Sequence, residues 1–306
     1  MYCRRAFHRA ASAAGLCTEI MPHQAMGIAL SFSPAKQLNN VHLIFTWDIL
    51  MYDTLLVQDK GHISIISINR AEKLNSLGDE VRRDLLKAFK DFNADEGKRV
   101  AILTGEGRAF SAGADVSTSS EKGAGVDIEN ELSNSFHLIL KEMRYSRKLF
   151  ISVINGVVAG AGMSLALACD RSFASREGRF VMAFQGIGLA PDTGLTLILS
   201  RLAGARALPY LLQGGEFSAA EAENMGLVRV VEDPMVEAMK MAENLAEGPF
   251  GAYSVGKQLI TRAIYYDLDE FLKEEASLQG KLSEGHDFME GVKAFREKRK
   301  PKFKGE

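Results

Sequence analysis

The sequence predicts an α/β fold, because strand, glycine-rich loop and helix follow one another three times through its middle. The first cycle consists of "VAILTG" (100–105), "GEGRAFSAGADV" (105–116) and "IENELSNSFHLILKEMRYS" (128–146). The second consists of "LFISVING" (149–156), "VVAGAG" (157–162) and "MSLALAC" (163–169). The third has two strands, "RSFAS" (171–175) and "RFVMA" (179–183), before the helix "LTLILSRLAG" (195–204). We expect the ligand to bind where the loops meet the helix starts.

The segment before these cycles reads as a hairpin and a helix. Two β-rich runs, Leu55 to Gln58 and Ile63 to Asn69, are joined through Asp59-Lys60-Gly61, which is a hairpin signal. Residues 77–93 place apolar side chains at helical spacing, and these are Val81, Leu85, Leu86, Phe89 and Phe92. The run "VAILTG" that follows is apolar throughout, which is typical of a strand buried on both faces of a parallel sheet.

From about Phe217 the pattern changes to successive amphipathic helices with almost no strand signal. We therefore predict three parts: an amino-terminal extension (1–53), an α/β core (54–216) and a helical carboxyl-terminal region (217–306). The last residues, "KAFREKRKPKFKGE", are strongly basic. Such a tail is usually solvated, but it could meet an anionic phosphate.

The bulk composition excludes several classes of protein. With 306 residues, 46% of them apolar, the chain can bury a large core. A net charge of -2 gives no reason to expect nucleic acid or a membrane as partner. Three cysteines, Cys3, Cys17 and Cys169, are too few for a disulfide framework or a zinc site, which fits a reducing compartment. We predict no metal site, and we expect Cys169 to be a small core residue.

The first fifty residues allow two interpretations. Arg4, Arg5 and Arg9 stand among small residues with no acid before Glu19, which is the composition of a mitochondrial transit peptide. Alternatively, Met51 is the true initiator, because the segment that starts to resemble a fold begins there. We predict a cytoplasmic protein, or a mitochondrial matrix protein if the leader is genuine.

Two loops of small residues could stabilise a developing negative charge. In the first, Gly113 stands between Ala112 and Ala114; in the second, Gly160 and Ala161 precede an apolar helix. Glycine permits turns that aim a backbone N–H outward, and the start of a helix has free N–H groups and a positive dipole end. Each loop alone could be purely structural. Together they could supply one N–H each to an oxyanion hole. Neither a Walker phosphate loop nor a G-x-G-x-x-G helix start is present, which disfavours dinucleotide binding.

Five motifs resemble the crotonase family of enoyl-CoA hydratases and isomerases, in the same order and at the same spacings. They are "NRAEKLNSL", "GRAFSAGADV", "NGVVAGAGMSLALACD", "IGLAPDTG" and "EGVKAFREKRKPKF", and the resemblance covers roughly Thr54 to Lys304. It implies a crotonase-like spiral of repeated β-β-α units with a helical carboxyl-terminal region, assembled as a homotrimer or homohexamer. It also implies an acyl-CoA thioester as substrate, with coenzyme A part of the substrate and no separate cofactor.

The resemblance assigns roles to individual residues. The N–H groups of Ala114 and Ala161 would bind the enolate oxygen. The remaining positions implied to contact the substrate or coenzyme A are Lys73, Leu74, Ala112, Gly113, Asp115, Val116, Gly160, Gly162, Ser164, Phe184, Phe295 and Lys298.

The departures from the family pattern favour an isomerase. The two glutamates with which the hydratases activate water are replaced by Ser164 and Phe184, neither of which can act as a carboxylate base. Asp192, after Pro191 in "IGLAPDTG", stands where the isomerase branch has its single acid, and the pattern is most similar to the epoxyphenylacetyl-CoA isomerase type. This leaves Asp192 as the only plausible carboxylate at the reaction centre. Its apolar neighbours should raise its pKa toward the working pH.

Other interpretations stay open. Asp192 could instead cap the helix that begins at Leu195. Ser164 could be the nucleophile of a hydrolase, although His62, His137 and His286 stand in no recognisable partner motif. We expect His137 to be an ordinary surface or satisfied histidine. A non-catalytic member that binds acyl-CoA or RNA has only the basic tail in its favour, and an ordinary hydratase with an atypical single carboxylate is the closest alternative activity. The segment "STSSEKGAGVDIENEL" (117–132) should form a flap over the substrate.

Overall fold

The computed structural model describes residues 48–115 and 127–306. None of the helices in these two stretches is both long and apolar enough to cross a membrane. Val116 and most of the predicted flap lie outside the described residues.

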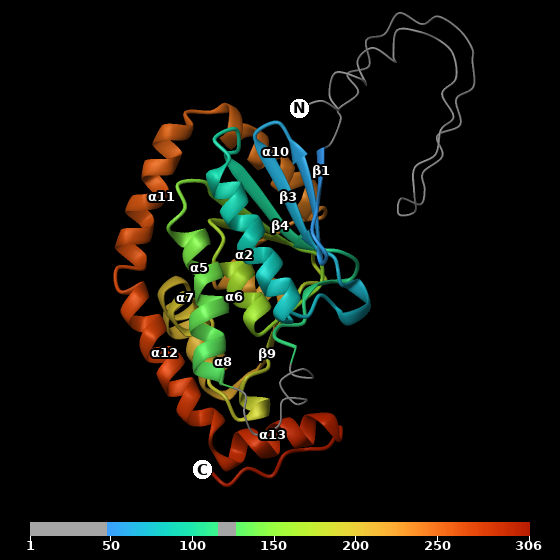
Figure 1. The fold of residues 1–306 in the computed structure, drawn as a ribbon, viewed down its shortest axis with the longest axis vertical. Helices are drawn as coiled ribbons and strands as arrows, with labels where there is room; N and C mark the ends of the chain where they lie inside the picture. The colour runs from blue at the N-terminus through green and yellow to red at the C-terminus, as the bar shows by residue number, and fades with distance from the viewer. Residues whose placement is uncertain (1–47, 116–126) are drawn as a thin grey trace, which may run out of the picture. The chain divides into compact units, whose positions relative to one another are not determined.

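A seven-stranded sheet carries most of the core (Figure 1). In spatial order it consists of β1 (Asp48–Met51), β2 (Leu55–Lys60), β3 (Ile63–Ile68), β4 (Val100–Gly105), β6 (Leu149–Ile154), β8 (Arg171–Ala174) and β11 (Arg229–Val230). The pairs β1–β2 and β2–β3 are antiparallel, which confirms the predicted hairpin, and every later pair is parallel. Strands β3, β4 and β6 are buried along their whole length, which explains why "VAILTG" contains no alternating polar positions. Strand β1 lies within 1–53, so the sheet begins a few residues before the predicted start of the core.

A second sheet of four short strands was only partly anticipated. Its spatial order is β10 (Gly215–Ser218), β9 (Arg179–Met182), β7 (Val157–Ala159) and β5 (Ala109–Ser111). The prediction that the residues of β5 and β7 belong to loops is wrong, because three residues are too few to show a period. Each repeat therefore has one strand in each sheet before its helix, as a β-β-α unit requires. The ends of β5 and β7 lie side by side in this sheet.

The helices of the core follow the predicted cycles. They are η1 (Ala71–Lys73), α2 (Asp79–Ala94), α4 (Ile128–Glu131), η2 (Leu132–Phe136), α5 (His137–Arg144), α6 (Ala161–Leu167), η3 (Gln185–Ile187), α7 (Leu195–Leu202), η4 (Gly204–Ala207) and α8 (Leu208–Gln213). The predicted helix over 128–146 is present, with the π-helical turn η2 between α4 and α5. Helix α2 buries the predicted face through Val81, Leu85, Phe89 and Phe92.

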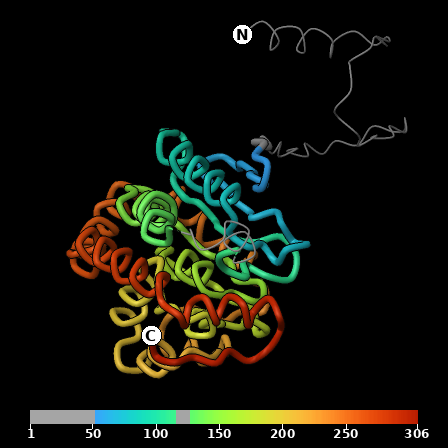
Figure 2. The backbone as a smooth tube through the Cα atoms, turned by 60° about the horizontal axis from the view of Figure 1, so that its bottom comes forward, coloured from blue at the N-terminus to red at the C-terminus, as the bar shows by residue number. Residues whose placement is uncertain are grey.

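Five further helices follow β10. They are α9 (Ala219–Asn224), α10 (Pro234–Glu247), α11 (Phe250–Ile264), α12 (Leu268–Ser283) and α13 (His286–Arg296). Alanines at 238, 242 and 246 bring α10 close to the large sheet, while α11 and α12 run one after the other along the side of the molecule that carries α5 and α7 (Figure 1). The final residues turn back along α13, as Figure 2 shows. Because β11 and the end of β10 lie beyond 216, the last part is not purely helical. The division into three parts stays a prediction.

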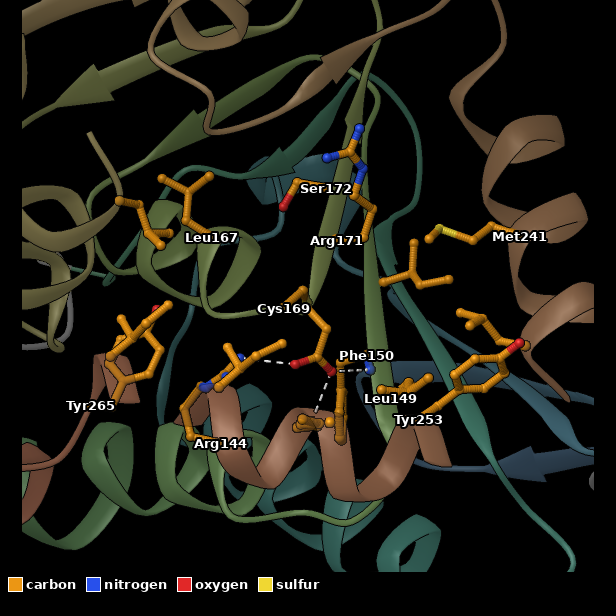
Figure 3. Close-up of a pocket in the computed structure, with 18 of the residues that line it drawn as sticks. Arg144, Leu149, Phe150, Leu167, Cys169, Arg171, Ser172, Met241, Tyr253 and Tyr265 are labelled. Carbon is orange, nitrogen blue, oxygen red and sulfur yellow. Dashed lines mark hydrogen bonds and ion pairs between the residues drawn. The ribbon is translucent and has the colours of Figure 1, made fainter. Parts of the chain in front are cut away.

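A charged cluster fastens α11 to the core. Asp170 accepts hydrogen bonds from the backbone N–H of Phe150 (2.9 Å) and from Arg144 (3.1 Å), and it forms an ion pair with Lys257 (2.9 Å). Arg144 and Phe150 line a cavity of about 440 Å³. Figure 3 is a close-up of this cavity, in which dashed lines mark hydrogen bonds and ion pairs between the residues drawn. Cys169 lines the same cavity as a buried free thiol, which confirms it as a core residue, and burial raises its pKa. None of the predicted site residues lines this cavity.

Removing Asp170 should destabilise the fold strongly, because Arg144 and Lys257 would remain buried without their counter-charge. We expect Asp170→Ala to lower the free energy of unfolding by about 3 kcal/mol in urea titrations. Glu216→Ala is the matched control, since the Arg179–Glu216 pair is more than half exposed on both sides and should contribute less than about 1 kcal/mol. Equal losses in the two variants would contradict the assigned role of the cluster.

Candidate active site

The first small-residue loop leaves β5 in a fixed geometry. The N–H of Ala112 donates to the carbonyl of Leu74, and the N–H of Leu77 donates to the carbonyl of Gly113, both at 2.8 Å. Gly113 has a φ of 87°, and a Cβ at this position would lie 2.7 Å from the carbonyl oxygen of Ala159. Only glycine therefore satisfies both the backbone angle and the space.

The second loop lies directly against the first. Gly160 has a φ of 50° and precedes α6, whose first residue is Ala161. A Cβ on Gly113 would lie 3.6 Å from the backbone nitrogen of Ala161, and a Cβ on Gly162 would lie 2.7 Å from the Cβ of Ser111. Within the described residues, no carbonyl accepts a hydrogen bond from the N–H of Ala114 or of Ala161. Two unsatisfied donors thus come from adjoining turns, one of them at a helix start.

Asp192 is the buried acid beside these turns. It is 8% exposed, and its carboxylate accepts hydrogen bonds from the hydroxyl of Thr193 (2.9 Å) and the amide of Gln279 (3.0 Å). Burial raises the pKa of Asp192 to about 7, and the nearby carboxylate of Glu275 acts in the same direction. The two hydrogen bonds oppose this shift. A carboxyl whose pKa lies near neutrality can both take and return a proton.

Asp192 does not cap the following helix, so that alternative is wrong. The N-cap residue of α7 is Gly194, and the helix start has no side-chain capping hydrogen bond from its N-cap residue. Instead, the N–H of Gly194 donates to Glu275 on α12, at 2.9 and 3.1 Å to its two oxygens. A distant carboxylate satisfies the helix start, and this leaves Asp192 available for another role.

The two turns and Asp192 meet in one small cavity of about 100 Å³. Seven predicted site residues line it, and these are Ala112, Gly113, Ala114, Gly160, Ala161, Phe184 and Asp192. The remaining lining side chains are mainly apolar and come from α4, η2, η3 and α13; they include Ile128, Leu132, Phe136, Ile187, Phe288 and Val292. The cavity is therefore a mostly apolar pocket in which one acid and two backbone donors converge.

Ser164 lies outside the lining of this cavity. It is fully buried in α6, and its hydroxyl donates to the backbone carbonyl of Asp192 at 3.3 Å. The histidines of the core are engaged elsewhere, since His62 contacts the carbonyl of Gly97, His137 contacts Glu275 and His286 contacts Asp287. Ser164 therefore has no histidine partner among the described residues, which counts against a serine hydrolase.

The other predicted contacts also lie off the cavity wall. Lys73 ends η1, and Leu74 follows it with a left-handed backbone next to Ala112. Gly162 packs on the end of β5, and Asp115 follows the first turn. Phe295 is 61% exposed at the end of α13, and Lys298 is exposed just beyond it. The basic tail is tied back to α13, because the N–H groups of residues 304 and 305 donate to Asp287.

A second carboxylate, Glu131 of α4, lines the cavity and was missed. Asp192 is therefore one of two carboxylates on the cavity wall, and its assignment as the catalytic one stays a prediction. Glu131 is paired at 2.9 Å with the buried guanidinium of Arg82, whose plane lies over the ring of Phe136. It lies near the end of the poorly patterned flap segment (117–132), where sequence offers no period from which to place a side chain.

A buried polar pair on α12 was also missed. Glu275 and Gln279 lie on the buried face of that helix with Leu268, Leu272 and Ala276. His137 is buried and hydrogen-bonded to Glu275 at 2.9 Å, which confirms it as a satisfied histidine. The available signal was the presence of two polar residues, one turn apart, in an otherwise apolar stripe. Within the described residues, no cluster of acidic, histidine or cysteine side chains could hold a metal ion.

The fold and this pocket define an α/β protein of β-β-α repeats that directs two backbone donors and a buried acid into one apolar cavity. The chain belongs to the enoyl-CoA hydratase/isomerase (crotonase) family, because the family model described as Enoyl-CoA hydratase/isomerase matches residues 58–306. It is accordingly an enzyme of this family, and the family implies an acyl-CoA substrate.

The similar proteins include both named activities of the family. The 1,2-epoxyphenylacetyl-CoA isomerase of Escherichia coli (strain K12) is 35% identical, with 83% of this chain and 100% of that protein covered. A probable enoyl-CoA hydratase of Rhodobacter capsulatus is also 35% identical, with 84% and 100% covered. The crystal structure of an enoyl-CoA hydratase from Mycobacterium avium subsp. paratuberculosis K-10 superposes with a TM-score of 0.74 at 31% identity, covering 83% of this chain and 100% of that one. Equal identity to an isomerase and a hydratase does not decide between the two activities.

Proposed function

We propose that the protein is an acyl-CoA isomerase that moves a double bond or proton through a thioester enolate. The observation that carries the proposal is the position of Asp192, a buried acid on the same cavity wall as the free N–H groups of Ala114 and Ala161. Candidate substrates are 3-enoyl-CoA and 1,2-epoxyphenylacetyl-CoA, the latter suggested by a relative that carries this activity in its name.

The proposed reaction on 3-enoyl-CoA needs one base. The carboxylate of Asp192 removes a proton from C2, beside the thioester carbonyl, and the electron pair moves into the carbonyl, where the oxygen becomes negative. The N–H groups of Ala114 and Ala161 donate to that oxygen, and each such donor typically contributes about a hundred- to a thousandfold in rate. Asp192 then returns its proton at C4, and the double bond forms between C2 and C3. No atom is gained or lost.

The side chains around Asp192 support this mechanism over hydration. Phe184 lines the cavity where a hydratase has a glutamate, and Ser164 is turned away beneath Asp192. An apolar wall keeps water away from the enolate and holds the pKa of the acid near neutrality. We further propose that Lys73, Leu74, Asp115, Phe295 and Lys298 contact the coenzyme A portion outside this cavity, and that Val116 also contacts coenzyme A.

The second candidate function is hydration of a 2-enoyl-CoA, and Glu131 is the observation that favours it. A hydratase needs a group that activates water together with a proton donor. Glu131 and Asp192 line the same cavity, so they could share these two tasks. The ion pair with Arg82 speaks against this, because the guanidinium already engages the carboxylate that would have to activate the water.

Two substrates supplied separately distinguish the two functions. We expect the enzyme to convert 3-enoyl-CoA into the conjugated 2-enoyl isomer, and the absorbance of the conjugated thioester measures this rate. We expect it to add water to 2-enoyl-CoA at least about a hundredfold more slowly. Glu131→Gln should change the isomerase rate less than about tenfold, because it takes no proton in that reaction. A hydration rate that exceeds isomerisation and falls sharply in Glu131→Gln would establish the second candidate instead.

We also propose a homotrimer or homohexamer in the cytoplasm, or in the mitochondrial matrix if the amino-terminal segment is a leader. Helix α11 supports the assembly, since Val255, Leu259 and Ile260 are each at least half exposed on it. An apolar stripe of this kind is typical of a surface that another subunit covers. Sedimentation equilibrium of the purified protein would measure the assembly.

A further inference from the structure

Helix α12 supports the loop of Asp192 through two side chains one helical turn apart. Gln279 exchanges hydrogen bonds with Ala190, receiving one from its N–H (3.2 Å) and donating one to its carbonyl (2.6 Å). The same amide nitrogen donates to the carboxylate of Asp192 at 3.0 Å. Gln279 is 1% exposed, so this contact is shielded from water. A donated hydrogen bond favours the ionised form of the carboxyl that accepts it.

Glu275 supports the other end of the same loop. Its carboxylate accepts hydrogen bonds from the N–H of Gly194 and contacts the ring of His137. Burial lowers the pKa of His137 to about 4. The ring is therefore neutral at neutral pH and does not cancel a charge on Glu275. Burial raises the pKa of Glu275, and the backbone N–H groups of Gly194 and Thr193 oppose that shift because they hydrogen-bond the ionised carboxylate. Ionised Glu275 in turn raises the pKa of Asp192, so the two carboxyls titrate as a pair.

The charged groups near Glu275 and this part of α12 come from three other elements. Helix α5 contributes His137 and, one turn later, Lys141, which lies in an ion pair with Asp269. Helix α4 contributes Glu129, whose side chain lies beside Gly280, and Glu131, which is held by Arg82. The loop contributes Asp192 itself. Among these groups, Asp192 is the one whose pKa the charge of Glu275 raises.

We propose that Glu275 and Gln279 are positioning residues that act through Asp192 in opposite directions: the charge of Glu275 makes Asp192 hold its proton more tightly, and the amide of Gln279 makes it release the proton more readily. Neither side chain lines the cavity, so neither contacts the substrate. The balance between them sets the pH at which Asp192 becomes a base. The consequence for catalysis rests on the proposed function, whereas the coupling itself does not.

The titration of Asp192 can be measured without any substrate. The full chain is labelled with carbon-13 at the aspartate carboxyl carbons, and the resonance of Asp192 is identified by its loss in Asp192→Asn. In Glu275→Gln, which keeps the size of the side chain, we expect the titration midpoint to fall by about one pH unit. In Gln279→Met, which removes the donor, we expect it to rise by about one unit. Glu274→Gln changes an exposed neighbour on the same helix and should leave the midpoint unchanged.

Shifts in the same direction, or none in either variant, would overturn the proposal. Circular dichroism establishes that each variant is folded, and Gln279→Ala replaces Gln279→Met if the methionine does not fit. The pH profile of kcat/KM then separates the two proposals. If the acidic limb follows the resonance of Asp192, both stand. If the resonance moves and the limb does not, the coupling stands and the catalytic role of Asp192 fails. If Asp192→Asn abolishes activity but Glu275→Gln changes neither the titration midpoint of Asp192 nor the acidic limb of the pH profile, the coupling fails and the proposed function stands.

Discussion

Asp192→Asn should lower the rate of double-bond migration by about two to four orders of magnitude, because asparagine keeps the shape of the side chain but cannot accept the C2 proton. Coenzyme A affinity should stay within about twofold, since the amide changes no contact outside the cavity. The rate is measured with saturating 3-enoyl-CoA, and the affinity by calorimetry with a non-reactive acyl-CoA. Wild-type activity in this variant would contradict the assignment.

The same substitution should stabilise the protein above neutral pH. The pKa of Asp192 is raised from 3.8 to about 7 in the folded protein, so the unfolded chain loses its proton first. The resulting penalty is absent below about pH 4, grows between pH 4 and 7, and is fully present above pH 7. The amide in Asp192→Asn does not ionise and carries no such penalty, so we expect a gain on the order of a few kcal/mol at pH 8 and none at pH 4. Thermal unfolding of both proteins at the two pH values would measure it, and a gain of the same size at pH 4 would contradict the interpretation.

Gly113→Ala should lower the rate by about a hundred- to a thousandfold, which is the typical effect of losing one donor of an oxyanion hole. The new Cβ would lie 2.7 Å from the carbonyl oxygen of Ala159, on a residue whose φ is 87°. The first turn must then move away from the second, and the N–H groups of Ala114 and Ala161 no longer converge. The loss should appear in kcat rather than in KM, because a ground-state carbonyl needs these donors less than an enolate does.

The control for Gly113→Ala is Gly61→Ala in the β2–β3 turn. Gly61 also has a positive φ, of 55°, but a Cβ there would meet no atom within 4 Å. It therefore reproduces the backbone strain without the collision. We expect a small loss of stability and unchanged kcat in Gly61→Ala. A similar loss of rate in both variants would mean that strain, and not the geometry of the two donors, causes the effect.

The parts of the site that sequence predicts are those built from local turns. Gly113 and Gly160 stand in glycine-rich loops between a predicted strand and a predicted helix, and Asp192 follows Pro191 shortly before a third predicted helix, so glycines, prolines and helix starts are enough to find them. The structure places these turns around one cavity, as expected. The parallel pairing of β5, β7 and β9 explains this, because it brings the ends of consecutive repeats to one edge.

The parts that sequence does not predict depend on contacts between distant segments. Glu275 lies 81 residues from Gly194, and Gln279 lies 87 residues from Asp192, yet each forms a direct hydrogen bond there. Glu131 reaches the cavity from α4, which lies within the unpatterned segment 117–132. In each case the polar side chain has no local motif, and only the packing of α4 and α12 against the core gives it a partner.

Proton transfer without addition of water is tested most directly by incubating the protein separately with 3-enoyl-CoA and with 2-enoyl-CoA in oxygen-18-labelled water, then separating the thioesters by chromatography and weighing them by mass spectrometry. We predict that 3-enoyl-CoA becomes the 2-enoyl isomer, which has the same mass and is recognised by its retention time and conjugated absorbance, and that 2-enoyl-CoA gains almost no heavy oxygen. Unchanged 3-enoyl-CoA, together with rapid conversion of 2-enoyl-CoA into a 3-hydroxyacyl-CoA that carries the heavy oxygen, would contradict an isomerase and establish a hydratase.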